Sequence, residues 1–321
     1  MTKFLVTGGA GFIGGNFLHL MVNKYPNDQY VCLDALTYAG NIKTLEQIMN
    51  KPNFKFVHEN ICNREEIYKL FEKEHFDYVI NFAAESHVDR SINNPEIFLK
   101  TNVLGVEILL DACRKYGIKR YHQVSTDEVY GDSCKNIYFD ENSKLNPSSP
   151  YSVSKAAADM LVLSYHKTYD LPITISRSCN NYGPYQHPEK MIPLMILKAL
   201  KNEKLPIYGN GLNVRDWIYV EDTCQAIDII VRNGKDGEIY NISGHNEKQN
   251  LDVIKTILII LNKSENLISY VKDRPGHDLK YSMISKKIEN ELGWKLKYNF
   301  EIGLKYTIDW YLRNQDWTNS F

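Results

Sequence analysis

The sequence of 321 residues carries a formal net charge of −1, which excludes a general electrostatic attraction to nucleic acid or to an anionic membrane. Its composition, 43% hydrophobic and 24% charged, is that of a globular protein, and no apolar run approaches the roughly 20 residues of a membrane span. The six cysteines form no C-x-x-C pair and the chain starts without a charged leader, so we expect free thiols, no metal site and a cytoplasmic location.

The first half of the chain alternates short apolar runs with amphipathic segments. The strand candidates are Phe4–Val6, Tyr30–Leu33, Phe54–Val57, Tyr78–Phe82, Tyr121–Ser125 and Ile173–Ser176. Helical patterns occupy Arg64–Glu74, Pro95–Tyr116 and Ser152–Tyr169. This alternation predicts an α/β fold, a doubly wound (Rossmann) parallel sheet with helices on both faces. Such a sheet binds ligands beyond the carboxyl ends of its strands.

Beyond about residue 178, prolines and glycines break the pattern into short pieces. We therefore expect a nucleotide-binding domain over residues 1–178 and a smaller mixed α/β, mainly substrate-binding domain over residues 179–321. The chain is expected to return to the large sheet around residues 223–243, near Gln225–Ile230 and Ile239–Ile242. The boundary is soft, because two domains that share one cleft often exchange segments.

A glycine-rich turn follows the first strand candidate directly. Residues 7–14 read Thr-Gly-Gly-Ala-Gly-Phe-Ile-Gly, which fits G-x-x-G-x-x-G from Gly8 or G-x-G-x-x-G from Gly9. Glycine lets the backbone approach a pyrophosphate at the N-terminus of the next helix. Asp34 ends the following strand candidate, where a carboxylate accepts the ribose hydroxyls and repels a 2′-phosphate. The pattern predicts NAD rather than NADP; the alternative is a turn followed by a surface acid.

Tyr151 and Lys155 stand at the start of a helical pattern. Their i, i+4 spacing puts the phenol and the ammonium on one face of the helix. A nearby ammonium lowers the pKa of a phenol from its usual value of about 10, so Tyr151 could serve as a base toward a hydroxyl group. Taken alone, the pair is common by chance and usually marks a solvated helix face.

Thr126, Asp127 and Glu128 come immediately after another strand candidate. Turns favour Asp, so the segment could be only a turn. However, it occurs together with the glycine fingerprint and the Tyr/Lys pair, in the order in which a doubly wound sheet brings such residues together. The combination predicts an active site with paired carboxyl groups.

These motifs resemble those of the extended short-chain dehydrogenase/reductase family and, within it, the dTDP-glucose 4,6-dehydratases. The matching stretches are residues 7–14, 83–91, 126–131, 151–155, 180–185, 215–217 and 274–277, which span nearly the whole chain. The Asp127–Glu128 pair discriminates best, because relatives that epimerise or decarboxylate nucleotide sugars generally keep the Tyr/Lys pair but lack it.

The resemblance implies dehydration of dTDP-glucose with tightly bound NAD, regenerated in each turnover. Tyr151 takes the proton of the 4-hydroxyl as hydride passes from C4 to NAD, Lys155 keeps Tyr151 ionised and binds the nicotinamide ribose, and Thr126 hydrogen-bonds the developing carbonyl. Glu128 then removes the C5 proton while protonated Asp127 protonates the departing C6 hydroxyl. The hydride returns to C6, and C5 is reprotonated. Burial and mutual repulsion can push the two carboxyl pKa values apart as this requires.

By resemblance, further residues belong to the two binding sites. The NAD site comprises Gly8, Gly11, Phe12, Ile13, Gly14, Asp34, Ala35, Leu36, Thr37, Asn60, Ile61, Ala83, Ala84, Thr101, Tyr151, Lys155 and Asn181. The substrate pocket comprises Ser86, Thr126, Asn180, Lys190, Met191, Pro206, Tyr208, Arg215, Asn250, Arg274 and His277. Arg215 and Arg274 suit a diphosphate, since a guanidinium fork fits phosphate oxygens, although without the resemblance each is a surface arginine. Tyr208 packs either on the pyrimidine or in the core.

The sequence departs from the family pattern at several positions. Asn60 stands where an Asp is usual beside the adenine, and we expect a mild effect because an amide can still hydrogen-bond there. His187 replaces a Phe in the loop before Pro188, so we expect the packing of that loop near the sugar site to change.

Two alternative functions remain open. A relative acting on a UDP- or GDP-sugar as dehydratase, epimerase or decarboxylase is the nearest, and a non-catalytic NAD-sensing protein is remote because Tyr151 and Lys155 are intact. The helical stretches at residues 103–113 and 156–163 carry wide apolar surface. In the family these helices form the four-helix contact of a dimer, which implies a homodimer here; otherwise they only pack on the sheet.

Overall fold

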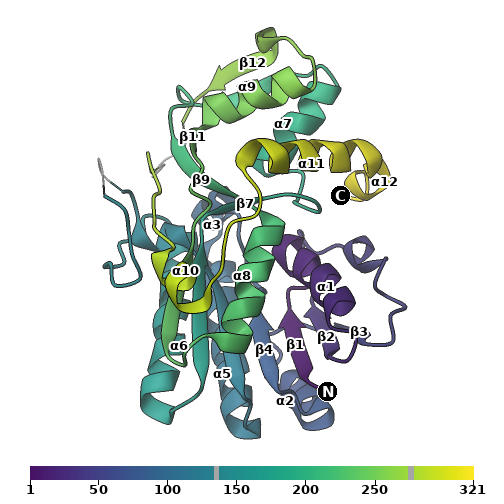
Figure 1. The fold of residues 1–321 in the computed structure, drawn as a ribbon, viewed down its shortest axis with the longest axis vertical. Coiled ribbons are helices and arrows are strands. Elements are labelled where there is room, and N and C mark those ends of the chain that lie inside the picture. The colour runs from purple at the N-terminus through teal and green to yellow at the C-terminus, as the bar shows by residue number, and fades with distance from the viewer. Residues whose placement is uncertain (134–136, 274–277) are drawn as a thin grey trace.

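A seven-stranded sheet, parallel throughout, forms the centre of the larger lobe in the computed structural model, which describes residues 1–133, 137–273 and 278–321. Its strand order is β10-β6-β5-β4-β1-β2-β3 (Figure 1). The strands are β1 (Lys3–Thr7), β2 (Gln29–Asp34), β3 (Phe54–His58), β4 (Tyr78–Asn81), β5 (Arg120–Thr126), β6 (Ile173–Ser178) and β10 (Glu238–Ile242). The six strand predictions coincide with β1 to β6, and the doubly wound fold is confirmed.

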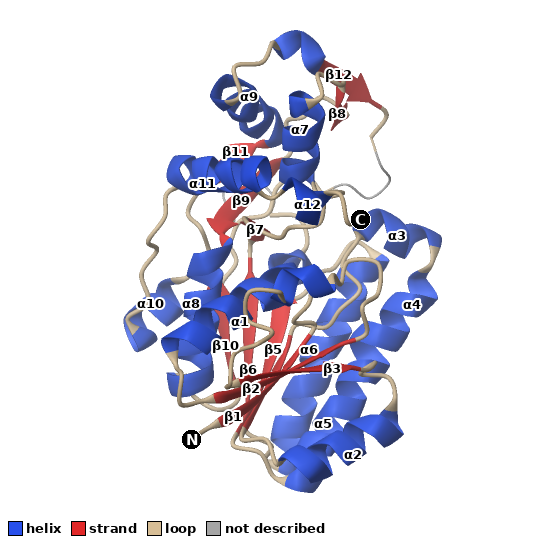
Figure 2. Ribbon diagram, turned by 90° about the vertical axis from the view of Figure 1, so that its right-hand side faces the viewer, coloured by secondary structure: helices blue, strands red, loops and turns tan. Residues whose placement is uncertain are grey.

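Helices cover both faces of this sheet (Figures 1 and 2). One face carries α1 (Phe12–Lys24), α8 (Val220–Asn233) and α10 (Lys286–Leu292), and the other carries α2 (Arg64–Glu74), α5 (Gly105–Tyr116) and α6 (Pro150–Tyr169). Each helical layer buries its own apolar core against the sheet. Burial on both faces explains why the strands read as nearly continuous apolar runs.

The helix predicted over Pro95–Tyr116 is interrupted, which corrects the prediction. A helix α4 (Pro95–Leu99) leads into a π-helical turn at Lys100–Leu104, and α5 follows. Within this turn the buried Asn102 accepts a hydrogen bond from the Glu85 backbone N–H at 2.9 Å and donates to the Glu85 carbonyl oxygen at 3.0 Å. These two bonds attach the loop after β4 to the π-helical turn. Such π-helical turns are frequent at functional sites.

The smaller lobe combines short strands with helices around a third apolar core. A three-stranded sheet contains β7 (Asn180–Tyr182) parallel and β11 (Glu247–Gln249) antiparallel to β9 (Val214–Tyr219), and a two-stranded sheet pairs β8 (Leu205–Tyr208) with β12 (Ile268–Val271). Its helices are α7 (Met191–Leu200), α9 (Asn250–Ile260), α11 (Phe300–Arg313) and α12 (Gln315–Thr318). A short helix of the larger lobe, α3 (Val88–Asn93), lies at the junction of the lobes (Figure 2).

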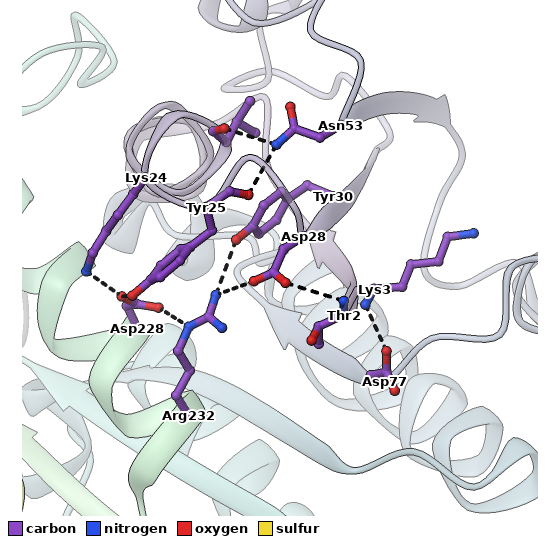
Figure 3. A network of polar contacts seen from close by, with 11 residues as sticks. Thr2, Lys3, Lys24, Tyr25, Asp28, Tyr30, Asn53, Asp77, Asp228 and Arg232 are labelled. Carbon is purple, nitrogen blue, oxygen red and sulfur yellow. Dashed lines mark hydrogen bonds and ion pairs between the residues drawn. The ribbon is translucent and has the colours of Figure 1, made fainter.

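The chain comes back from the smaller lobe to the large sheet through α8 and β10. Residues 225–230 lie in α8, a helix that packs on α1, and β10 pairs with β6 at the edge of the sheet. A polar network holds α8 in place (Figure 3): Asp228 receives hydrogen bonds from Lys24 and Tyr25, each at 2.8 Å, and from Arg232 at 2.7 Å. Arg232 also donates to Asp28 at 2.8 Å. Because Asp28 precedes β2, this network lies at the amino end of the sheet.

Candidate active site

A cavity of about 230 Å³ lies at the carboxyl ends of the strands of the large sheet. Segments that follow β1, β2, β3 and β4, and residues near the end of β5, contribute to its wall, as the doubly wound fold predicts. Of the residues predicted from the sequence, the wall contains Gly8, Gly11, Phe12, Ile13, Gly14, Asp34, Ala35, Thr37, Asn60, Ile61, Ala83, Ala84, Ser86, Thr101, Tyr151, Lys155 and Lys190.

The glycine turn forms a cradle that a larger residue would fill. Gly8 has a φ of 68°, in the left-handed region, and a Cβ placed on it would lie 2.5 Å from the Ala83 backbone nitrogen. A Cβ on Gly14 would lie 2.5 Å from the Gly8 carbonyl oxygen. Gly11 is the N-cap of α1, and the first turn of this helix contains no acidic residue. The helix therefore presents its N–H groups and its positive dipole end to the cavity, which suits a pyrophosphate.

Asp34 is placed at the end of β2 to face a ribose. Its carboxylate accepts the Ala10 N–H at 2.9 Å and the Leu36 N–H at 2.8 Å, which fixes its orientation. Burial raises its pKa, and these two hydrogen bonds oppose the rise. The glycine cradle, the uncapped helix and this acid together fit the pyrophosphate and adenosine ribose of NAD. Leu36 itself is absent from the described cavity wall.

Asn60 is exposed, and its side-chain oxygen accepts the Cys62 N–H at 2.8 Å. An Asp oxygen could accept the same bond, which agrees with the mild effect expected for this departure.

Tyr151 and Lys155 lie one turn apart at the start of α6, as their spacing predicts. The helix begins with a capping box between Ser149 and Ser152. Lys155 is buried, and its Nζ donates to the Val124 carbonyl oxygen on β5 at 2.7 Å. Burial lowers the pKa of Lys155 to about 8.

The pKa of Tyr151 shifts in the direction opposite to the sequence expectation. Burial raises it well above the usual value, and the charges of Glu128 and Asp127 add to the rise, while a hydrogen bond with Thr126 opposes it. The ammonium of Lys155 is hydrogen-bonded to the Val124 carbonyl oxygen. Ionisation of Tyr151 therefore needs added positive charge beside its hydroxyl.

Asp127 and Glu128 differ in their surroundings, although they are adjacent. Asp127 is 4% exposed; its Oδ1 accepts the Thr126 hydroxyl at 3.1 Å, and its Oδ2 is buried without a hydrogen-bond partner among the described residues. Burial, with the charge of Glu128, raises the pKa of Asp127 to about 8. Glu128 is half-buried. Asp127 is thus a carboxyl group that keeps its proton at neutral pH, as a general acid requires.

The smaller lobe supplies a second set of predicted residues. Arg215 is buried and donates to the carbonyl oxygens of Val214 at 2.8 Å and Asp278 at 2.9 Å, with its guanidinium 4.2 Å from the Tyr281 ring, so it is not a surface arginine. Lys190 reaches across the cleft to the Ser86 carbonyl oxygen at 2.9 Å.

The remaining predicted substrate residues lie near the junction or outside the described chain. Tyr208 is 43% exposed and hence not core. The side-chain oxygens of Asn180, Asn181 and Asn250 are buried without a partner among the described residues. Among the described residues, the cavity wall does not include the predicted Thr126, Asp127, Glu128, Asn180, Asn181, Met191, Pro206, Tyr208, Arg215 or Asn250. Arg274 and His277 lie outside the described residues.

Sequence reasoning missed part of the cavity wall. The wall also contains Leu33, Tyr38, Ala39, Gly40, Glu59, Phe82, Glu85, Val124, Ser125, Gln186 and His187. Most of them directly flank motifs already recognised, so extending each motif by a few residues would have found them. Gln186 and His187 come from the other lobe. Among the described residues, no group of three or more His, Cys, Asp or Glu side chains is placed to hold a metal ion.

Comparisons with known proteins agree with this geometry. The family model described as GDP-mannose 4,6 dehydratase matches residues 5–307. The dTDP-glucose 4,6-dehydratase of Escherichia coli is 46% identical over 344 residues, covering 98% of this chain and 95% of that protein. A crystal structure of dTDP-glucose 4,6-dehydratase from Bacillus anthracis in complex with NAD is 47% identical with a TM-score of 0.94, covering 100% of this chain and 99% of that one. The Streptomyces venezuelae enzyme, also with NAD, is 43% identical with a TM-score of 0.95 over 98% of each chain.

Proposed function

The chain belongs to the dTDP-glucose 4,6-dehydratases of the extended short-chain dehydrogenase/reductase family, and from this premise we propose that it uses NAD to convert dTDP-glucose to dTDP-4-keto-6-deoxyglucose. The observation that carries the proposal is the buried carboxyl group of Asp127, whose Oδ2 has no hydrogen-bond partner among the described residues, beside the less buried Glu128 after β5. An epimerase moves a hydride and one hydroxyl proton, and it needs no second acid. Elimination of water needs an acid and a base together.

Bound NAD supplies the oxidation at C4 and the matching reduction at C6, without net consumption. Tyr151 accepts the proton of the 4-hydroxyl during the oxidation. Since burial holds its pKa high, its ionisation depends on positive charge nearby, a role that we assign to Lys155, one turn along α6. Thr126 hydrogen-bonds the 4-oxygen as it becomes a ketone.

The ketone at C4 makes the C5 proton acidic, because the resulting carbanion is conjugated with the carbonyl. Glu128, the less buried carboxyl group, removes this proton. Asp127 donates its proton to the C6 hydroxyl, which leaves as water. The unequal burial of the two groups supports this division of roles, since burial favours the protonated form of Asp127.

We assign the two ligands mainly to different lobes. We assign the NAD site to residues 1–178 with return segments around 223–243, and the nucleotide-sugar site mainly to residues 179–321. Lys190 and Arg215 are the described cations assigned to the substrate diphosphate, and Tyr208 is assigned to the pyrimidine. Asn180 and Asn250, whose side-chain oxygens are buried without a described partner, suit hydroxyl and amide donors of the ligand. Arg274 and His277 join this set on family resemblance.

A second candidate function is the same elimination on GDP-mannose, because the matching family model is described as GDP-mannose 4,6 dehydratase. The acid-base residues would act identically, so only the nucleotide and the sugar differ. We favour dTDP-glucose because the E. coli and B. anthracis relatives carry that name at 46% and 47% identity.

The test is mass spectrometry and proton NMR of dTDP-glucose incubated with the purified protein, without added NAD. We expect loss of one water and a new C6 methyl signal. Parallel incubations with GDP-mannose and a UDP-sugar identify the substrate. Unchanged dTDP-glucose in the presence of added NAD would overturn the proposal.

We also propose a homodimer in the cytoplasm. The helices α4 to α6 bury one face on the sheet and expose large apolar side chains on another: Leu99, Leu104, Val153 and Met160 are 50%, 57%, 45% and 64% exposed. Sedimentation of a monomer at micromolar concentration would contradict the dimer. The described cysteines are free thiols, in keeping with a reducing compartment. Within the described residues, no helix is both long and apolar enough to cross a membrane.

A further inference from the structure

Residues 315–321, called the strap below, comprise α12 and the turn after it, and they lie between the two lobes (Figures 1 and 2). Trp317 is 6% exposed, and its indole nitrogen donates to the Thr44 hydroxyl at 3.1 Å. The Asn41 side chain donates to the Ser320 hydroxyl at 2.6 Å. The strap is thereby attached to the larger lobe just after β2.

The strap also holds a loop of the smaller lobe, residues 185–190. The ring of Phe321 lies 4.4 Å from the His187 ring, centroid to centroid, at an angle of 72°. Trp317 lies 5.6 Å from the ring of Tyr185. Edge-to-face contacts of this kind stabilise the arrangement beyond the area they bury. One short segment therefore ties together two loops from opposite lobes.

Both of these loops form part of the wall of the NAD cavity. The larger lobe contributes Tyr38, Ala39 and Gly40, and the smaller lobe contributes Gln186, His187 and Lys190. The Tyr38 and His187 rings meet across the lobes at 5.7 Å. Phe321, His187 and Tyr38 thus form a row of rings that leads from the strap to the cavity wall.

A second contact fixes the same loop from α11. The Tyr311 hydroxyl, which is fully buried, donates to the Gln186 carbonyl oxygen. The Gln186 side chain in turn donates to the Asn181 carbonyl oxygen at 2.9 Å. The start of the loop is therefore held by the smaller lobe, while His187 contacts Phe321 of the strap and hydrogen-bonds the Tyr38 backbone of the larger lobe.

We infer that the strap restrains the loop at residues 185–190 and thereby slows the release of NAD. The inference rests on the proposed function, which requires one NAD to stay bound from the oxidation at C4 to the reduction at C6. For the cavity to open, this loop must separate from the loop after β2, and the strap is attached to both. Phe321 and His187 are positioning residues that act through the loop.

The experiment measures how fast labelled NAD leaves the NAD-loaded protein when unlabelled NAD is added in excess. In Phe321→Ala the aromatic pair is lost, and we expect release to become roughly two- to tenfold faster. His187→Ala removes the other ring of the pair and is expected to act similarly. His187→Phe keeps a ring against Phe321 but loses the hydrogen bond with the Tyr38 backbone, and we expect it to release NAD more slowly than His187→Ala.

Tyr306→Ala is the matched control. Tyr306 lies on α11 and is 49% exposed, against 44% for Phe321, and its ring neighbours among the described residues are Tyr219 and Tyr298. Its release rate should be unchanged. Melting temperatures of all variants identify any general loss of stability.

Unchanged release in both Phe321→Ala and His187→Ala would overturn the inference, as would equal acceleration in Tyr306→Ala. The assay contains no nucleotide sugar, so its result is independent of whether dTDP-glucose is the substrate.

Discussion

The buried polar groups at the two ends of the large sheet differ in whether they have hydrogen-bond partners among the described residues. At the amino end, the 4%-exposed side chain of Asp228 is paired with Lys24, Tyr25 and Arg232 (Figure 3). At the carboxyl end, Asp127 Oδ2 is buried without a hydrogen-bond partner among the described residues. The same strands connect these two ends of the sheet.

Several other polar atoms near the carboxyl end are also buried without a described hydrogen-bond partner. Glu85 Oε2, Ser125 Oγ and the side-chain oxygens of Asn180 and Asn181 are also buried without described partners. Most buried polar atoms in folded proteins are paired, and each exception asks for an explanation. One end of the sheet therefore uses its polar groups for stability, while the other keeps them for a ligand at a cost in stability.

The largest expected effect comes from removing the acid at the carboxyl end. Asp127→Asn keeps the shape of the side chain but cannot donate the proton, so we expect kcat to fall by about 10²–10⁴-fold. Stability should stay the same or rise, because a buried carboxyl group without a partner for Oδ2 is removed. Turnover and thermal unfolding are measured on the same sample.

Oxidation at C4 provides the internal control for this variant. It does not need Asp127, so absorbance of reduced nicotinamide should still appear when Asp127→Asn is mixed with dTDP-glucose. A variant with full turnover would contradict the assignment of Asp127 as the acid. A variant with a large loss of stability would contradict the contrast between the two ends of the sheet.

The second prediction concerns the amino end of the sheet, where removing a polar group should lower stability and leave turnover unchanged. Asp228→Ala leaves Arg232 and Lys24 without their shared partner, and we expect the free energy of unfolding to fall by about 2–3 kcal/mol. The figure is moderate because Lys24 and Arg232 are partly exposed. Turnover at low temperature, where the variant is folded, should be unchanged. Denaturant titration and kcat together test this, and a variant that is stable but inactive would refute it.

The contrast also explains what could be predicted from the sequence. The glycine turn, Asp34 and the Tyr151/Lys155 pair were found because each depends on local backbone geometry: a turn, a strand end and one turn of helix. The direction of the Tyr151 pKa was predicted wrongly, because burial and the charges of Glu128 and Asp127 depend on how separate segments meet. Spacing along one helix carries no information about either.

Contacts across the lobes were the hardest to foresee. His187 was noted in the sequence only as a departure from the family pattern, while its neighbours Tyr38 and Phe321 lie far from it in the chain. The π-helical turn at Lys100–Leu104 was missed for a related reason. Its residues continue a helical pattern, and it is the bonding of Asn102 to the loop after β4 that accompanies the widening.

The smallest expected effect is a pH dependence of activity that arises from residues at the carboxyl end of the sheet. Asp127 and Lys155 both have pKa values of about 8, and both must hold a proton: Asp127 to protonate the leaving hydroxyl, Lys155 to keep Tyr151 ionised. Once Tyr151 is ionised, activity should therefore fall as pH rises through about 8, by about tenfold per pH unit if only Asp127 loses its proton and more steeply if Lys155 does as well. Because the paired carboxylate of Asp228 plays no part in the reaction, Asp228→Ala should show the same profile of kcat/KM against pH. A profile that stays flat to pH 10 would mean that Asp127 is not the acid. A profile shifted in Asp228→Ala would mean that the two ends of the sheet are coupled rather than independent.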